Sequence, residues 1–94
     1  MAANRRLVSV LGSTGSIGVN TLDVIARHPE RFEVYALAAH SSVDAMLAQC
    51  LEFAPRYAVM MDDAAATLLR QRLPPDTVTE VKCGEGGLAD IATA

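Results

Sequence analysis

Short apolar runs alternate with amphipathic stretches along the whole chain. Four apolar runs predict strands, at residues 6–11, 31–39, 56–61 and 77–82. Four amphipathic stretches predict helices, at residues 16–28, 41–53, 62–73 and 85–94. This alternation implies right-handed strand–helix–strand crossovers and a mainly parallel α/β sheet. Because the strands are apolar almost throughout, we expect helices on both faces of that sheet.

The predicted first helix carries a broad apolar face. We expect its inward side to be formed by Ile17, Thr21, Leu22, Val24, Ile25 and His28. Pro29 ends this helix, and Pro74 and Pro75 end the third. The fourth helix reaches Ala94 without a stop signal. We therefore interpret residues 1–94 as part of one domain, truncated after about four strand–helix units.

Three glycines stand where the first strand meets the first helix, in the spacing G-x-x-G-x-x-G. A helix that starts there points unpaired N–H groups at the carboxyl edge of the sheet, where they bind a phosphate or diphosphate. Gly12 and Gly15 permit positive φ and a close backbone approach, and Gly18 lets the helix pack tightly on the strand. No lysine follows Gly18, so an ATP-type P-loop does not fit.

The position of these glycines favours dinucleotide binding in a Rossmann-like fold, because the first strand–helix turn holds the diphosphate there. Three hydroxyl side chains add hydrogen-bonding groups to the turn: Ser13, Thr14 and Ser16. A tight turn whose glycines serve packing alone is the alternative.

The end of the second strand bears on the choice of cofactor. NAD-binding folds usually place an acidic residue there, about 20 residues after the glycines, to bond the ribose 2′-hydroxyl. This chain has His40, Ser41 and Ser42 instead. The absence of a carboxylate favours NADP(H), although no arginine or lysine stands there either. Ser42 is also a candidate helix cap, and capping and ligand contact are compatible.

Composition excludes several other classes. The 94 residues carry a net charge of −3, which argues against a binder of duplex nucleic acid. The apolar run near the amino end is too short for a signal peptide or a membrane span. Cys50 and Cys83 are expected to be reduced, which suggests a cytoplasmic protein. Asp62 and Asp63 lie at a helix start, where acids are ordinary, so we assign them no metal.

Two stretches together resemble one enzyme family. LGSTGSIGVNTLDVIARHPERFEVYALAA and CLEFAPRYAVM are similar to the amino end of the 1-deoxy-D-xylulose 5-phosphate reductoisomerases. The resemblance extends over essentially the whole chain. It implies that Thr14, Gly15, Ser16 and Ile17 cradle NADPH. A second cofactor-binding segment in this family is typically glycine, then a basic residue, then asparagine. Those positions hold His40, Ser41 and Ser42 here, and Ser42 keeps a side chain that can form hydrogen bonds.

The resemblance further implies a two-stage reaction in non-mevalonate isoprenoid biosynthesis. A divalent cation (Mg²⁺, Mn²⁺ or Co²⁺) holds the small-molecule substrate while its carbon skeleton rearranges, and NADPH then reduces the product to 2-C-methyl-D-erythritol 4-phosphate. The resemblance places the catalytic and metal-binding residues beyond Ala94, so we expect none in this chain and no activity from it alone. It also implies a homodimer for the full-length enzyme, whereas charge, cysteine usage and the short apolar run predict a cytoplasmic protein that binds neither nucleic acid nor membranes.

Two alternatives remain open at this point. One is another NADP-dependent reductase such as a semialdehyde dehydrogenase, which shares a looser glycine pattern. The other is a nucleotide-binding module without catalytic activity.

Overall fold

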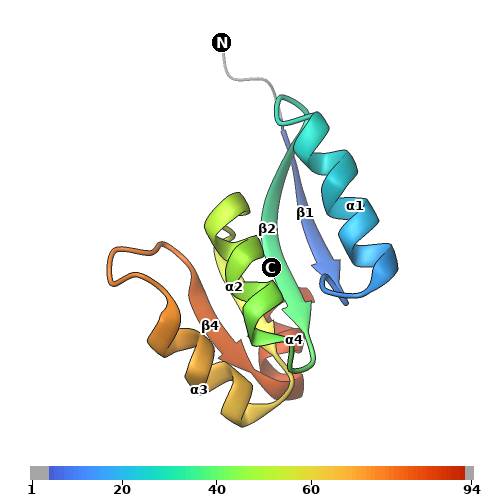
Figure 1. The fold of residues 1–94 in the computed structure, drawn as a ribbon. Helices are drawn as coiled ribbons and strands as arrows, with labels where there is room; N and C mark the ends of the chain where they lie inside the picture. The colour runs from blue at the N-terminus through green and yellow to red at the C-terminus, as the bar shows by residue number, and fades with distance from the viewer. Residues whose placement is uncertain (1–4, 93–94) are drawn as a thin grey trace.

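The computed structural model describes residues 5–92, in which strands and helices alternate (Figure 1). The strands are β1 (Arg6–Leu11), β2 (Phe32–Ala39), β3 (Tyr57–Met60) and β4 (Glu80–Cys83). The helices are α1 (Ser16–Arg27), α2 (Val43–Phe53), α3 (Asp63–Arg72) and α4 (Gly84–Ala92). The predicted element order and α/β class are therefore confirmed.

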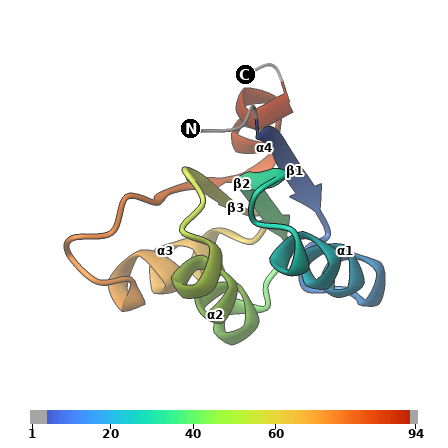
Figure 2. The same ribbon diagram turned by 90° about the horizontal axis from the view of Figure 1, so that it is seen from above.

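All four strands are parallel and lie in the order β1-β2-β3-β4. Helices α1, α2 and α3 cover one face of the sheet, whereas α4 lies on the other (Figure 2). The connections from β1 to β2, β2 to β3 and β3 to β4 all step in the same direction across the sheet. Right-handed crossovers that step in one direction place their helices on the same face, which explains the shared face of α1, α2 and α3. The expectation of helices on both faces is confirmed, with α4 alone on the second face among the described helices.

Two apolar clusters hold these layers together. The larger lies between the sheet and α1–α3 and includes the fully buried Leu37, Met46 and Leu69. The smaller lies under α4, where Ile91 packs with small residues of β2 and with β3. Since α4 contacts β3 and β4, it leaves β1 uncovered on that face. Leu7 and Leu11 of β1 accordingly remain well exposed.

The inward face of α1 is narrower than predicted. Gly18, Leu22 and Ile25 are its buried residues, at positions i, i+4 and i+7. Four of the expected inward residues are not buried: Ile17, Thr21, Val24 and His28. The reason is that α1 lies at the edge of the layer, where it rests on β1 and β2 and is separated from α2 by a groove.

The fourth strand begins later than predicted, at Glu80. The N–H of Thr77 donates to the carbonyl of Pro74 and closes a turn, which takes residue 77 out of the strand. Thr79 is buried because its hydroxyl donates to the carbonyl of Pro55 at 2.6 Å. One turn hydrogen bond and one side-chain hydrogen bond therefore take the place of the strand-to-strand hydrogen bonds expected over residues 77–79.

No described helix has the length and apolar character needed to cross a membrane.

Cys50 provides a test of the core beneath α2. Burial raises the pKa of its thiol from 9.0 to about 11. The folded chain thus keeps a proton that the unfolded chain loses above pH 9, and stability falls between pH 9 and 11. We expect Cys50→Ala to remove a slope of up to about 1.4 kcal/mol per pH unit in the free energy of unfolding. Urea unfolding of both proteins across this range measures the difference, and identical pH profiles would contradict it.

Candidate functional site: the β1–α1 turn

The turn between β1 and α1 is built from backbone geometry rather than from side chains. Gly12 has a φ of +68°, which favours glycine. The N–H of Gly15 donates to the carbonyl of Gly12 at 3.0 Å, and the N–H of Ser13 donates to Ala38 of β2 at 2.9 Å. The chain therefore turns sharply at the carboxyl end of β1 and stays attached to the neighbouring strand.

Gly18 allows α1 to lie directly against this turn. A Cβ atom added at Gly18 would overlap the carbonyl oxygen of Gly12 and would lie 2.6 Å from the Cα of Ser13. Both neighbours are backbone atoms, so neither can swing aside. The predicted packing role of Gly18 is confirmed: only a residue without a side chain permits this approach.

The opening of α1 offers free hydrogen-bond donors. Gly15 is the N-cap and supplies no side-chain cap, and the first intrahelical acceptor bond runs from the N–H of Val19 to the carbonyl of Gly15 at 2.9 Å. None of the hydrogen bonds within residues 5–92 uses the N–H of Ser16, Ile17 or Gly18. These amides and the helix dipole form a site suited to an anion.

The predicted site residues in this turn lie where they can meet a ligand. Ser16 and Ile17 are exposed, and the side chain of Ile17 is 84 % exposed although it is apolar. Thr14 is half-buried. Neither hydroxyl, of Thr14 or of Ser16, forms a hydrogen bond with any residue that the structure describes. The structure therefore brings Thr14, Gly15, Ser16 and Ile17 together around the start of α1.

The second predicted segment lies at the carboxyl end of the adjacent strand β2. His40, Ser41 and Ser42 are exposed, and Ser42 is the N-cap residue of α2. Its side chain makes no capping hydrogen bond. The prediction that Ser42 lies at the start of this helix is confirmed. The prediction that its side chain caps the helix is wrong, and its hydroxyl stays available to a ligand.

A cation lies beside Ser42 that the sequence did not reveal. Arg72, at the end of α3, lines a shallow hollow of about 490 Å³ together with Ser41 and Ser42. Its Nη1 forms an ion pair with Asp44 in the first turn of α2. Asp44 takes only one of the five guanidinium N–H groups, so Arg72 keeps donors for another anion.

The remaining polar residues at this edge have ordinary structural roles. Asp62 accepts the N–H of Ala65 at 2.9 Å and so caps α3. Burial raises the pKa of the Cys83 thiol, as does its hydrogen bond to Asp63 at 3.4 Å. Within residues 5–92, no three His, Cys, Asp or Glu side chains lie close enough to hold a metal ion.

The comparisons with known proteins agree with this geometry. The family model for 1-deoxy-D-xylulose 5-phosphate reductoisomerase matches residues 8–94. The chain belongs to the 1-deoxy-D-xylulose 5-phosphate reductoisomerase family. The reductoisomerase of Saccharophagus degradans is 53 % identical over 88 residues, which are 93 % of this chain and 22 % of that protein. The reductoisomerase of Aromatoleum aromaticum is 56 % identical over 86 residues, which are 90 % and 21 %.

Solved reductoisomerases share the fold. The Zymomonas mobilis enzyme in complex with NADPH superposes with a TM-score of 0.88 at 34 % identity, over 95 % of this chain and 23 % of that one. A reductoisomerase in complex with NADPH, fosmidomycin and magnesium gives 0.85 at 36 %, over 94 % and 22 %. This chain thus spans about a fifth of the length of its reductoisomerase relatives. The family match decides against the semialdehyde dehydrogenase alternative.

Gly18 gives a direct test of the turn. We expect Gly18→Ala to lower the free energy of unfolding by about 1–3 kcal/mol, because its methyl group would overlap the backbone of the turn. Gly86→Ala is the matched control: Gly86 lies in α4 with nothing within 4 Å of an added Cβ, so we expect a gain of about 0.5–1 kcal/mol. Urea unfolding measures both, and equal effects would contradict the packing role of Gly18.

Proposed function

We propose that residues 1–94 are the amino-terminal NADPH-binding part of a longer reductoisomerase. That enzyme converts 1-deoxy-D-xylulose 5-phosphate to 2-C-methyl-D-erythritol 4-phosphate for isoprenoid synthesis. The observation that carries the proposal is the group of three free amides at the start of α1, in a chain that belongs to this family. Solved relatives that superpose on this chain were determined in complex with NADPH, which supports the same assignment.

The topology supports placing the ligand at the carboxyl end of β1. Because α4 lies on the opposite face from α1–α3, a right-handed connection through α4 must step in the opposite direction, from β4 toward β1. The next parallel strand would then pair with the free edge of β1. In such sheets the ligand binds in the crevice where the direction of winding reverses. The β1–α1 turn lies beside that crevice.

We assign the diphosphate of NADPH to the turn formed by Thr14, Gly15, Ser16 and Ile17. The N–H groups of the first helical turn donate to its oxygens, and the dipole of α1 favours its negative charge. When bound, NADPH supplies the hydride for the reduction. Ile17, exposed and apolar, would offer a nonpolar contact to a cofactor held by these amides.

We assign the adenosine 2′-phosphate to Ser42, with Arg72 as its cation. The family typically has a basic residue at the position of Ser41, and this chain does not. Arg72 lies across the hollow from Ser41 and Ser42 and supplies positive charge from α3 instead. Arginine N–H groups and a serine hydroxyl are suitable donors for phosphate oxygens.

We propose that the enzyme is divided between this chain and the rest of the protein. The lack of a candidate metal cluster in residues 5–92 supports assigning the divalent cation to the rest of the protein. We assign the substrate site and the catalytic residues there as well, as the family resemblance implies. We also infer a homodimeric, cytoplasmic enzyme that acts on a small molecule. The net charge of −3 and the two free cysteines are consistent with this inference.

An assay of NADPH oxidation with 1-deoxy-D-xylulose 5-phosphate and Mn²⁺ tests the assignment. We expect turnover by the full-length protein and none by residues 1–94 alone. Turnover by the 94-residue chain would contradict the division of the enzyme. A full-length protein that reduces this substrate with NADH as well as with NADPH would contradict the assignment of the 2′-phosphate.

Arg72→Gln tests the 2′-phosphate site in the full-length enzyme. We expect the KM for NADPH to rise about tenfold, because a charge-assisted hydrogen bond to the phosphate is lost. The KM for NADH should change by less than about twofold, because NADH has no 2′-phosphate. Steady-state kinetics with both cofactors give the two values.

Arg27→Gln is the matched control for this variant. Arg27 forms a comparable exposed ion pair with Asp23 at 3.0 Å, at the end of α1 far from the turn. We expect no change in either KM. Equal rises for NADPH and NADH in Arg72→Gln would show that Arg72 does not recognise the 2′-phosphate.

A further inference from the structure

One side chain reaches the cofactor turn from a different helix. The Nε2 of Gln49, on α2, donates a hydrogen bond to the carbonyl of Ser13 at 2.8 Å. Ser13 is fully buried, with an exposed fraction of 0 %. Because the N–H of the same residue donates to Ala38 of β2, Ser13 is tied to the fold through both of its backbone polar groups.

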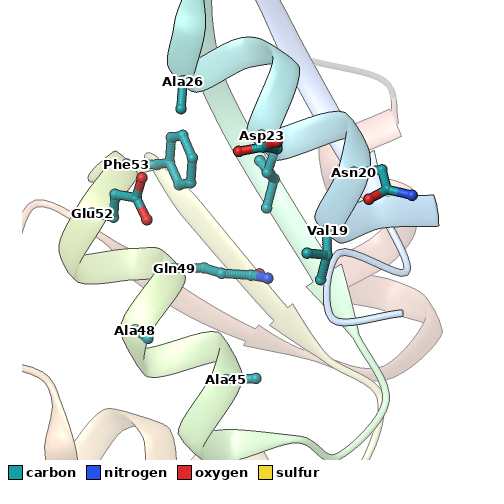
Figure 3. Close-up of a pocket in the computed structure, with 10 residues that line it drawn as sticks. Val19, Asn20, Asp23, Ala26, Ala45, Ala48, Gln49, Glu52 and Phe53 are labelled. Atoms are coloured by element: carbon teal, nitrogen blue, oxygen red, sulfur yellow. The ribbon is translucent and has the colours of Figure 1, made fainter. Parts of the chain in front are cut away.

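Gln49 makes this contact across a groove. The groove separates α1 from α2 and has a volume of about 380 Å³, with Val19 and Asp23 on one side and Glu52 and Phe53 on the other (Figure 3). The side chain of Gln49 extends from α2 toward the start of α1 in this view. Among hydrogen bonds of the described residues, the one from Gln49 is the link between α2 and the β1–α1 turn.

We propose that Gln49 is a positioning residue for NADPH: it fixes the β1–α1 turn so that the amides of α1 point at the diphosphate. This inference rests on the proposed function. Gln49 does not touch the cofactor in this account and acts only through Ser13. Nothing about its role follows from the glycine pattern, because it lies in another element.

The contact is difficult to replace. Gln49 is the described donor to the carbonyl of Ser13, and that residue is buried, so losing it leaves a buried acceptor without a partner. The hydroxyl of Ser13 and the Oε1 of Gln49 are also buried without a partner among the described residues. None of the hydrogen bonds among residues 5–92 gives the carbonyl of Ser13 a second donor, so we expect the loss of Gln49 to loosen the turn.

The same helix also carries the second cofactor segment. Ser42 is the N-cap of α2, and Gln49 follows seven residues later, about two turns along. A link from Gln49 to the turn therefore fixes the diphosphate donors relative to the start of α2. This geometry holds the two phosphate subsites of NADPH at a constant separation.

Gln49→Met in the full-length reductoisomerase tests the inference, because methionine keeps the length of the side chain and removes the donor. We expect the KM for NADPH and the KM for NADH to rise by the same factor, about tenfold, since both cofactors contain the diphosphate. The value of kcat at saturation should stay within about twofold, because the reacting groups are untouched. If Gln49 had only a structural role, Gln49→Met would lower the melting temperature without raising both KM values at constant kcat.

Two control variants make the result specific. Gln71→Met changes an exposed glutamine on α3 and should alter neither KM. Ser42→Ala should raise the KM for NADPH alone, because it affects the 2′-phosphate and not the diphosphate. The combined pattern separates a change in the turn from a change in the second segment.

Kinetics of Gln49→Met and of the unmodified enzyme distinguish a failure of this inference from a failure of the proposed function. If the unmodified enzyme uses NADPH and Gln49→Met leaves both KM values unchanged, this inference is wrong while the proposed function stands. If the unmodified enzyme does not use NADPH, the proposed function itself is wrong. Should Gln49→Met fail to fold, Gln49→Glu keeps the shape but places a carboxylate against the carbonyl of Ser13, and an unchanged KM in this variant would equally overturn the inference.

Discussion

The whole site depends on the direct contact between the first turn of α1 and the backbone of the β1–α1 turn. Gly18 makes this contact possible, because any side chain there would overlap Gly12 and Ser13. With the helix in this position, its free amides open at the carboxyl end of β1. Moving α1 outward by even one methyl group would therefore displace the donors as well as disturb the core. Stability and binding geometry share one constraint.

In the proposed function, helix α2 contributes to the site at two positions. At its amino end Ser42 has a free hydroxyl, and in its interior Gln49 donates a hydrogen bond to the turn. Charge at the amino end is balanced, because Arg72 pairs with Asp44. A doubly charged phosphate placed beside this pair is attracted to Arg72 and repelled by Asp44. In the proposed 2′-phosphate site the cation therefore comes from α3, because the segment at the end of β2 carries no arginine or lysine.

The local features of the fold could be predicted from the sequence because they depend on neighbouring residues. The strand over 6–11 and the role of Gly18 follow from an apolar run and from glycine spacing, and both are confirmed. The strand expected from residue 77 was wrong at its start, because Thr79 bonds to Pro55, which is distant in sequence. Ile17 was wrongly expected to be buried, since periodicity does not show that α1 lies at the edge of its layer.

No role of Arg72 or Gln49 was predicted from the sequence. Arg72 lines the hollow beside Ser42 only because α3 packs beside α2, and no local sequence pattern predicts that contact. Gln49 did leave a signal: it lies three residues after the buried Met46 and four before Phe53, so it is a polar residue on the apolar side of its helix. Such a residue needs a hydrogen-bond partner, and here the partner is the carbonyl of Ser13 in the β1–α1 turn.

In the proposed function, the amides at the start of α1 hold the diphosphate of NADPH. A crystal structure of the full-length reductoisomerase with NADPH would locate this diphosphate. We predict that oxygens of the diphosphate lie within hydrogen-bond distance of the N–H groups of Ser16, Ile17 or Gly18. A bound NADPH whose diphosphate lies elsewhere, with these three amides facing solvent, would show that this assignment is wrong.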